Sequence, residues 1–202
     1  MDKILFVDLD STLWDTEPLY YEGMMRLFGR YIAPDERVDF NWPRALGDNW
    51  WDLFDYALHP NKIYKREFYP YAVDALYKIV YMRFGIHFCS HNPNRILLEG
   101  PVRLWLEDAF NFDFDLTIFG ARNDKIDYMD THVGGWGIVE DKPSTIRKAV
   151  RKGYPTFMRV HNYNLPLLED SYLADNIYAF EDWKLMPGLV KEALDNATQS
   201  VR

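Results

Sequence analysis

Short apolar runs recur along the chain, and most are followed directly by charged or turn-forming residues. The first is Ile-Leu-Phe-Val at residues 4–7, which ends at Asp8. A strand that is buried on both faces has a continuous apolar sequence of this kind, and such strands are typical of parallel sheets. We therefore expect strands at residues 4–7, 86–89, 116–119, 136–139, 156–160 and 177–180.

Helical patterns fill most of the intervals between these runs. They cover residues 72–83, 95–109, 144–151 and 181–196, with a bend expected at Pro101. Because strands and helices alternate, the sequence predicts an α/β protein with a three-layer, Rossmann-like parallel sheet. In open sheets of this kind the functional groups gather at the carboxyl ends of the strands.

The interval between the first two strands is too long for a single crossover helix. We expect residues 18–68 to form a small helical cap inserted after the first strand, and residues 1–17 and 69–202 to form the core. A small cap needs aromatic residues to bury enough area, but at least one of them is expected to stack on a substrate. The aromatic candidates are Trp42, Trp50, Trp51, Phe54, Tyr64 and Phe68, and we assign substrate contact to Trp50, Trp51, Tyr64 and Phe68.

Composition excludes several classes of protein. The 31 acidic and 23 basic residues give a net charge of −8, which argues against a protein that coats nucleic acid or an anionic membrane. A hydrophobic content of 48% excludes disorder, and a single cysteine, Cys89, excludes an internal disulfide. Without a signal peptide or an apolar stretch of about 20 residues, we expect a soluble, cytoplasmic protein.

Carboxylates, hydroxyl groups and an amine lie at or near the ends of the expected strands. Any one of the acidic or hydroxyl residues is explained equally well as a helix N-cap. Together, at one edge of a sheet, they are typical of a site for a divalent cation and a phosphate group. The residues are Asp8, Asp10 and Thr12 after the first strand, Ser90 after the second, Lys125 before the fourth, and Glu140 and Asp141 after it.

These residues, in this order, resemble the four motifs of the haloacid dehalogenase superfamily. Within it the chain is most similar to the 5′(3′)-deoxyribonucleotidases. The similarity extends to residues 70–76, 105–110, 123–125, 140–143, 161–164 and Trp183. The chain departs from those nucleotidases at Ser11-Thr12, where they have Gly-Val, and at Glu140, where they have Asp.

Each residue has an expected role in phosphoryl transfer. Asp8 is the expected nucleophile, which would form an aspartyl-phosphate, and Asp10 the general acid and base. Thr12 is expected to orient Asp10, to cap the following turn or to bind phosphate. Ser90 and Lys125 would hold phosphate oxygens.

The expected cofactor is Mg²⁺. Its ligands would be Asp8, the backbone carbonyl of Asp10, and Asp141, with Glu140 bound directly or through water. With Asp10 protonated, the other three carboxylates carry −3, and Mg²⁺ with Lys125 carries +3. Without the ion, like-charge repulsion would oppose folding.

We therefore predict an Mg²⁺-dependent phosphatase, with deoxyribonucleoside monophosphates as the first substrate class. The alternatives are a phosphatase for another small phosphomonoester or a nucleic-acid end, and a non-catalytic protein that binds nucleotide or phosphate. The expected partner is a small molecule, not a membrane or a long nucleic acid. The sequence leaves the oligomeric state open, with a homodimer among the alternatives.

Overall fold

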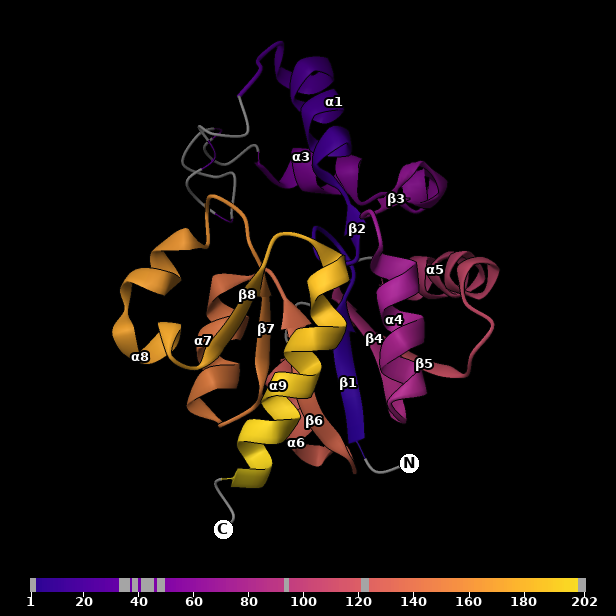
Figure 1. The fold of residues 1–202 in the computed structure, drawn as a ribbon. Coiled ribbons are helices and arrows are strands. Elements are labelled where there is room, and N and C mark those ends of the chain that lie inside the picture. The colour runs from indigo at the N-terminus through magenta and orange to yellow at the C-terminus, as the bar shows by residue number, and fades with distance from the viewer. Residues whose placement is uncertain are drawn as a thin grey trace.

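A six-stranded parallel sheet forms the centre of the computed structural model, in the order β5-β4-β1-β6-β7-β8 (Figure 1). Each expected apolar run forms one of its strands, so the predicted fold class is confirmed. Because β1 lies between β4 and β6, its carboxyl end is flanked by the ends of both. The strands are β1 (Lys3–Asp8), β4 (Phe84–His91), β5 (Phe114–Phe119), β6 (Gly135–Glu140), β7 (Thr156–Arg159) and β8 (Ile177–Phe180).

The structure describes residues 3–32, 37, 40, 46, 50–92, 95–120 and 124–199. Trp42, one of the aromatic candidates, lies outside them.

Helices cover both faces of the sheet and complete three layers (Figure 1). On one face, α4 (Ala72–Tyr81), α5 (Arg95–Ala109) and α9 (Met186–Gln199) pack on apolar residues of β1, β4 and β5. On the other, α6 (Lys125–Thr131) and α7 (Pro143–Arg151) pack on the alternate residues, such as Phe6.

Helix α5 runs from Arg95 to Ala109, with Pro101 inside it, and so has the expected bounds. Helix α6 was not expected, because seven residues are too few to show a helical period. The sequence feature that marks the start of α6 is its N-cap. The Asp124 side chain accepts hydrogen bonds from the backbone N–H groups of Ile126 and Asp127.

Helices α1 (Glu17–Phe28) and α3 (Trp50–Ala57) lie above the carboxyl ends of the central strands (Figure 1). They bury an apolar cluster of their own, which includes Leu19, Met24 and Leu53. The segment joins the core through a short antiparallel pair of strands, β2 (Trp14–Asp15) and β3 (Glu67–Phe68), that was not expected. The remaining elements are α8 (Ser171–Ala174) and 3-10 helices at Pro60–Lys65, Leu165–Glu169 and Trp183–Leu185.

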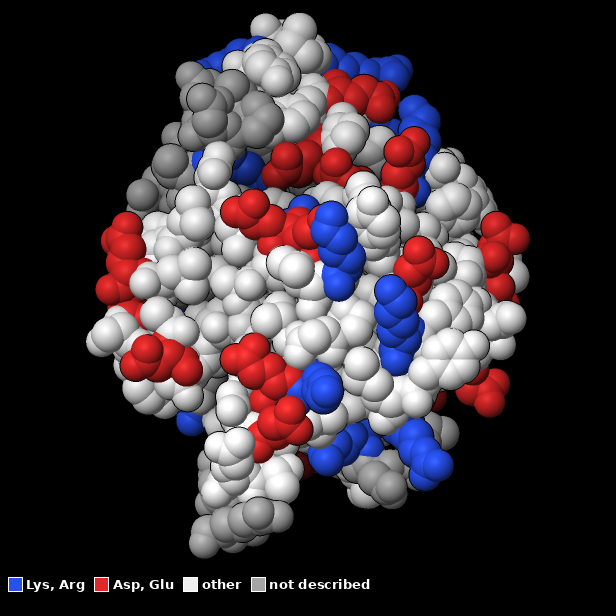
Figure 2. All heavy atoms as spheres, in the orientation of Figure 1, with Lys and Arg blue, Asp and Glu red and all other residues white. Residues whose placement is uncertain are grey.

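Acidic and basic side chains are interspersed on the face of the molecule drawn in Figure 2, without a continuous basic band among the residues described there. None of the helices in the described part of the chain is both long and apolar enough to cross a membrane.

Close packing beside β6 supplies a test of the fold. A Cβ atom on Gly137 would lie 2.8 Å from the backbone oxygen of Pro155, which cannot move without disturbing β7. We expect Gly137→Ala to lower the free energy of unfolding by about 1–3 kcal/mol in urea denaturation.

Gly188→Ala is the matched control. Gly188 lies in α9, and an added Cβ would meet nothing within 4 Å. Because alanine is the better helix former, this variant should gain roughly 0.5–1 kcal/mol. Equal effects at the two positions would contradict the close approach of β6 to Pro155.

Candidate active site

Three buried carboxylates and one ammonium group meet at the carboxyl edge of the sheet. Asp8 ends β1, Glu140 ends β6, and Asp141 follows it. Lys125, the first residue of α6, donates a hydrogen bond to Asp8 and lies 2.9 Å from Glu140 Oε2. Each of the four side chains belongs to a residue that is at most 4% exposed.

Burial and mutual repulsion shift the acidities of this group. Burial, together with the charge of Glu140, raises the pKa of Asp8 to about 7, even though Lys125 opposes the shift. Burial and the two neighbouring carboxylates raise the pKa of Asp141 well above its usual value. Burial also acts on Glu140, but Lys125, the backbone N–H of Lys142 and a hydrogen bond from the Asp141 side chain hold its pKa below the usual value. Without a bound cation, the cluster would therefore carry less negative charge near neutral pH than three free carboxylates.

This cluster fits a divalent cation. Oxygen atoms of Asp8, Glu140 and Asp141 lie within 4.8 Å of one another. An all-oxygen donor set suits a hard ion such as Mg²⁺. A bound cation would also relieve the repulsion that raises the pKa values of Asp8 and Asp141.

Hydrogen bonds from the core orient Asp141. The Tyr163 hydroxyl donates to its Oδ2 atom, and the Thr12 hydroxyl donates to Oδ1 at 3.2 Å. The side-chain amide of Asn164 donates to its backbone oxygen at 2.9 Å. Thr12 is fully buried, so in this structure it supports the metal-ligand candidate Asp141 and not Asp10.

Three donors hold the Asp10 carboxylate. The Trp14 indole N–H and Arg66 Nη1 donate to Oδ1 at 3.0 and 2.9 Å, and the Ser90 hydroxyl donates to Oδ2 at 2.8 Å. Ser11, the next residue, has a left-handed backbone with φ of 61°. The backbone turns there, which lets both Asp8 and Asp10 line one cavity.

That cavity has a volume of about 480 Å³, and residues at the strand ends and residues of α1 and α3 line it. Its lower wall holds the predicted catalytic and phosphate-binding residues Asp8, Asp10, Ser90 and Lys125, with Glu140 and Asp141. Its upper wall includes Tyr20, Arg37, Phe40, Trp50, Trp51 and Phe54.

The cap aromatics assigned to substrate contact divide into two groups. Trp50 and Trp51 line the cavity and stack on each other, with ring centroids 3.8 Å apart. Tyr64 and Phe68 are not among the described residues that line it; both pack against Trp105 of α5, with centroids 5.5 and 6.0 Å away. The structure therefore brings only the tryptophans to the candidate site.

Sequence reasoning did not identify Arg66, Arg37 and Tyr163 as parts of this site. The contact of Arg66 with Asp10 spans 56 positions and depends on how the insertion folds back. Arg37 donates to Glu17 at 3.1 Å and lies over the Tyr163 ring, 4.3 Å from its centroid. No local pattern marks such long-range contacts.

Comparisons with known proteins agree with this architecture. No protein-family model matches the chain, and no curated protein matches it by sequence. Solved structures do match it. A Thermotoga maritima protein assigned as a β-phosphoglucomutase aligns with a TM-score of 0.60 at 22% identity, over 94% of this chain and 99% of that one.

Two further structures have the same fold. A protein assigned as a phosphoglycolate phosphatase from Haemophilus somnus has a TM-score of 0.60 at 16% identity, over 93% of this chain and 97% of its own. A D,D-heptose 1,7-bisphosphate phosphatase from B. bronchiseptica, complexed with magnesium and phosphate, has a TM-score of 0.51 at 13% identity. This match covers 96% of this chain and 99% of that one. The chain thus shares the α/β fold of these solved structures.

Proposed function

We propose that the chain is a haloacid dehalogenase superfamily phosphatase that hydrolyses small phosphomonoesters with Mg²⁺. One observation carries the proposal: Asp8 and Asp10 line the same cavity as Lys125 and a buried carboxylate cluster that fits a divalent cation. This set contains a nucleophile, an acid–base group and the positive charge that a phosphoryl group needs.

Asp8 would attack phosphorus and form an aspartyl-phosphate, while the bond to the leaving oxygen breaks. Asp8, Asp141 and Glu140 would hold Mg²⁺, which when bound screens the negative charge on the carboxylate and the phosphoryl oxygens. Lys125, already in contact with Asp8, would balance the charge on the same oxygens. The Ser90 hydroxyl, which donates to Asp10 in this structure, would turn to donate its hydrogen bond to one of these oxygens.

Asp10 would donate a proton to the leaving alkoxide and then take one from the water that hydrolyses the aspartyl-phosphate. The same water supplies the oxygen that releases phosphate and restores Asp8. Arg66 and Trp14 would fix the direction of the Asp10 carboxylate during both steps. Since Arg66 precedes β3, the inserted segment takes part in positioning an acid–base group of the core.

For the substrate we propose deoxyribonucleoside monophosphates. Trp51, which is exposed, and the half-buried Trp50 offer an aromatic surface above the phosphate site, and a volume of about 480 Å³ suits a mononucleotide. We propose that residues 18–68 form the specificity cap and residues 1–17 and 69–202 the core; the separate apolar cluster of α1 and α3 supports this division. The cytoplasmic location remains a prediction.

Phosphoryl transfer through Asp8 and Asp10 can be tested with two leaving groups. Asp8→Asn should lower kcat by on the order of 10³-fold or more for both a deoxynucleotide and p-nitrophenyl phosphate. Asp10→Asn should lower it by roughly 10²–10⁴-fold for the nucleotide and much less for p-nitrophenyl phosphate, whose leaving group needs little protonation.

Asp130→Asn is the matched control. Asp130 lies on α6, away from the cavity, and its carboxylate accepts hydrogen bonds from Lys152 and Tyr154. The kcat of this variant should stay near that of the wild type. Near-normal activity of Asp8→Asn would exclude the covalent mechanism, and equal losses of Asp10→Asn on both substrates would remove Asp10 from the acid role.

Recognition of a base can be tested at the tryptophans. Trp50→Ala or Trp51→Ala should weaken binding of deoxynucleotides by roughly 1–3 kcal/mol, the usual contribution of a stacked base. Hydrolysis of p-nitrophenyl phosphate should change little. Tyr81→Ala, which removes an 84% exposed ring from α4, is the control.

Steady-state kinetics on both substrates separates the outcomes. Losses confined to nucleotides support a nucleotidase. Equal losses on both substrates would mean that the tryptophans only hold the cap together, and a phosphatase for another small phosphomonoester would then be favoured.

Binding of Mg²⁺ should depend on pH. The folded state keeps a proton on Asp8 up to about pH 7, whereas an unfolded aspartate loses it near 3.8. The contribution of Asp8 to the stability of the metal-free protein should therefore fall as pH rises from about 4 to 7, because at this residue the folded state binds more protons there. A cation displaces that proton, so Mg²⁺ should raise Tm more at pH 8 than at pH 5.

Thermal unfolding in EDTA and in Mg²⁺ at matched ionic strength measures this difference. Free Mg²⁺ at 100 times Kd should add about 2.7 kcal/mol, or several degrees in Tm. Asp141→Asn should reduce the response. A Tm indifferent to Mg²⁺ at both pH values would contradict the proposed site.

A further inference from the structure

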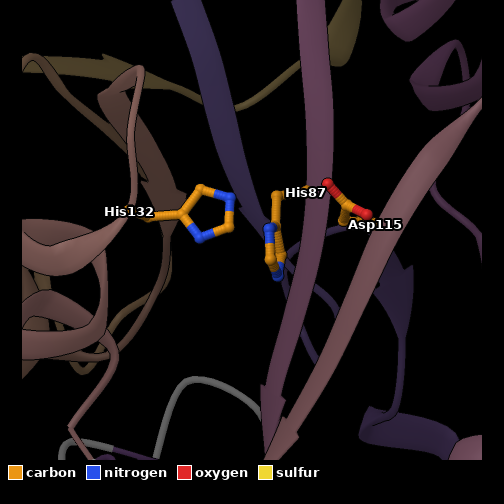
Figure 3. Close-up of side chains that lie close together, drawn as sticks. All are labelled: His87, Asp115 and His132. Carbon is orange, nitrogen blue, oxygen red and sulfur yellow. The ribbon is translucent and has the colours of Figure 1, made fainter.

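A second group of potential metal ligands lies on the face of the sheet that α6 and α7 cover. His87 comes from β4, Asp115 from β5, and His132 follows the last residue of α6. A ligand atom of each lies within 4.8 Å of those of the other two (Figure 3). The group shares no residue with the Asp8 cluster, and none of the three lines the cavity described above.

His87 carries an unsatisfied polar atom. The residue is 2% exposed, and its ring stacks on Phe6 with centroids 4.6 Å apart. Its Nε2 atom is hydrogen-bonded with the Thr117 hydroxyl at 2.9 Å, whereas Nδ1 is buried and has no hydrogen-bond partner within the described part of the chain. A buried polar atom without a partner costs stability, so it points to a missing ligand.

The hydrogen bond to Thr117 suits a metal-binding histidine. When Nε2 donates to the hydroxyl, Nδ1 carries the free lone pair. Ligating histidines commonly donate their second nitrogen in this way, which fixes the tautomer and the ring direction. Burial, with a smaller contribution from His132, also lowers the pKa of His87 to about 4, so the ring is neutral under ordinary conditions.

The other two residues, Asp115 and His132, are more exposed to solvent than His87. Asp115 is the register partner of His87 on β5, and neighbouring register positions present their side chains on the same face of a sheet. The His132 ring is nearly perpendicular to that of His87, with centroids 5.0 Å apart, and Figure 3 shows a nitrogen of each ring on the facing sides. Asp115 is exposed and His132 half-buried, so two of the three candidate ligands can be reached from solvent.

We propose that His87, His132 and Asp115 bind a transition-metal ion of the Zn²⁺ class, with water completing the coordination. Two imidazoles and one carboxylate form a nitrogen-rich donor set that favours Zn²⁺, Co²⁺ or similar ions over Mg²⁺. The ion would tie the end of α6 to β4 and β5. Since Lys125 begins α6, this site would stabilise the helix that presents Lys125 to Asp8.

Co²⁺ absorption spectroscopy in excess Mg²⁺ tests the site without using enzyme activity. Mg²⁺ occupies the all-oxygen cluster, and Co²⁺ with imidazole ligands in a low-coordinate site gives strong visible absorption. We expect the wild type to bind one Co²⁺ with such a band, which Zn²⁺ abolishes by displacement. In His132→Ala the band should be lost, and in Asp115→Asn the Kd should rise by about 10-fold or more.

The controls separate this site from the proposed active site and from misfolding. His59→Ala removes an exposed histidine remote from the group and should leave the band unchanged. Asp141→Asn should also leave it unchanged, whatever its effect on catalysis. Thr117→Val should weaken Co²⁺ binding by roughly 10–100-fold by removing the hydrogen bond to Nε2. Circular dichroism of each variant checks that it is folded.

Two results would overturn the proposal. A wild-type protein without a visible Co²⁺ band would show that His87 is a core histidine stacked on Phe6. A band that survives His132→Ala but disappears in Asp141→Asn would place the ion at the acidic cluster.

Discussion

Burial of Asp8, Glu140 and Asp141 with a single lysine is the constraint on which the carboxyl edge of the sheet depends. Three carboxylates within 4.8 Å repel one another, and removal from water adds to the cost. Lys125 offsets part of this by contact with both Asp8 and Glu140. Protonation near neutral pH or a bound cation relieves the remaining repulsion. The acidity of the carboxylates, the binding of a cation and the stability of the fold are therefore linked.

Much of the surrounding structure holds this cluster in place. Helix α6 starts at Lys125 because Asp124 caps it, and the parallel arrangement of β1 and β6 brings Asp8 beside Glu140. Tyr163 and Thr12 then fix Asp141 from opposite sides of the carboxylate. The donors are buried, so their geometry is set by packing and not by solvent.

A buried contact between Arg66 and Asp10 joins the inserted segment to this chemistry. Arg66 has a side chain only 1% exposed, and it donates to Asp10, whose carboxylate also accepts from Ser90 of β4. Asp10 therefore lies where the core and the insertion meet. A shift of the insertion that moved Arg66 would alter the position of the proposed acid–base group as well as the shape of the cavity.

The sequence by itself determined the α/β architecture and the residues at the strand ends. Continuous apolar runs identify buried parallel strands, and the end of a strand is a local property, so Asp8 and Glu140 could be placed without coordinates. The short helix α6 and the strands β2 and β3 were missed because each is too short for a periodic signal. Only the tertiary structure decided that Trp50 and Trp51 line the cavity while Tyr64 and Phe68 pack on Trp105. It also brought Arg66 to Asp10 and His132 to His87, because contacts between distant segments depend on packing that no local pattern records.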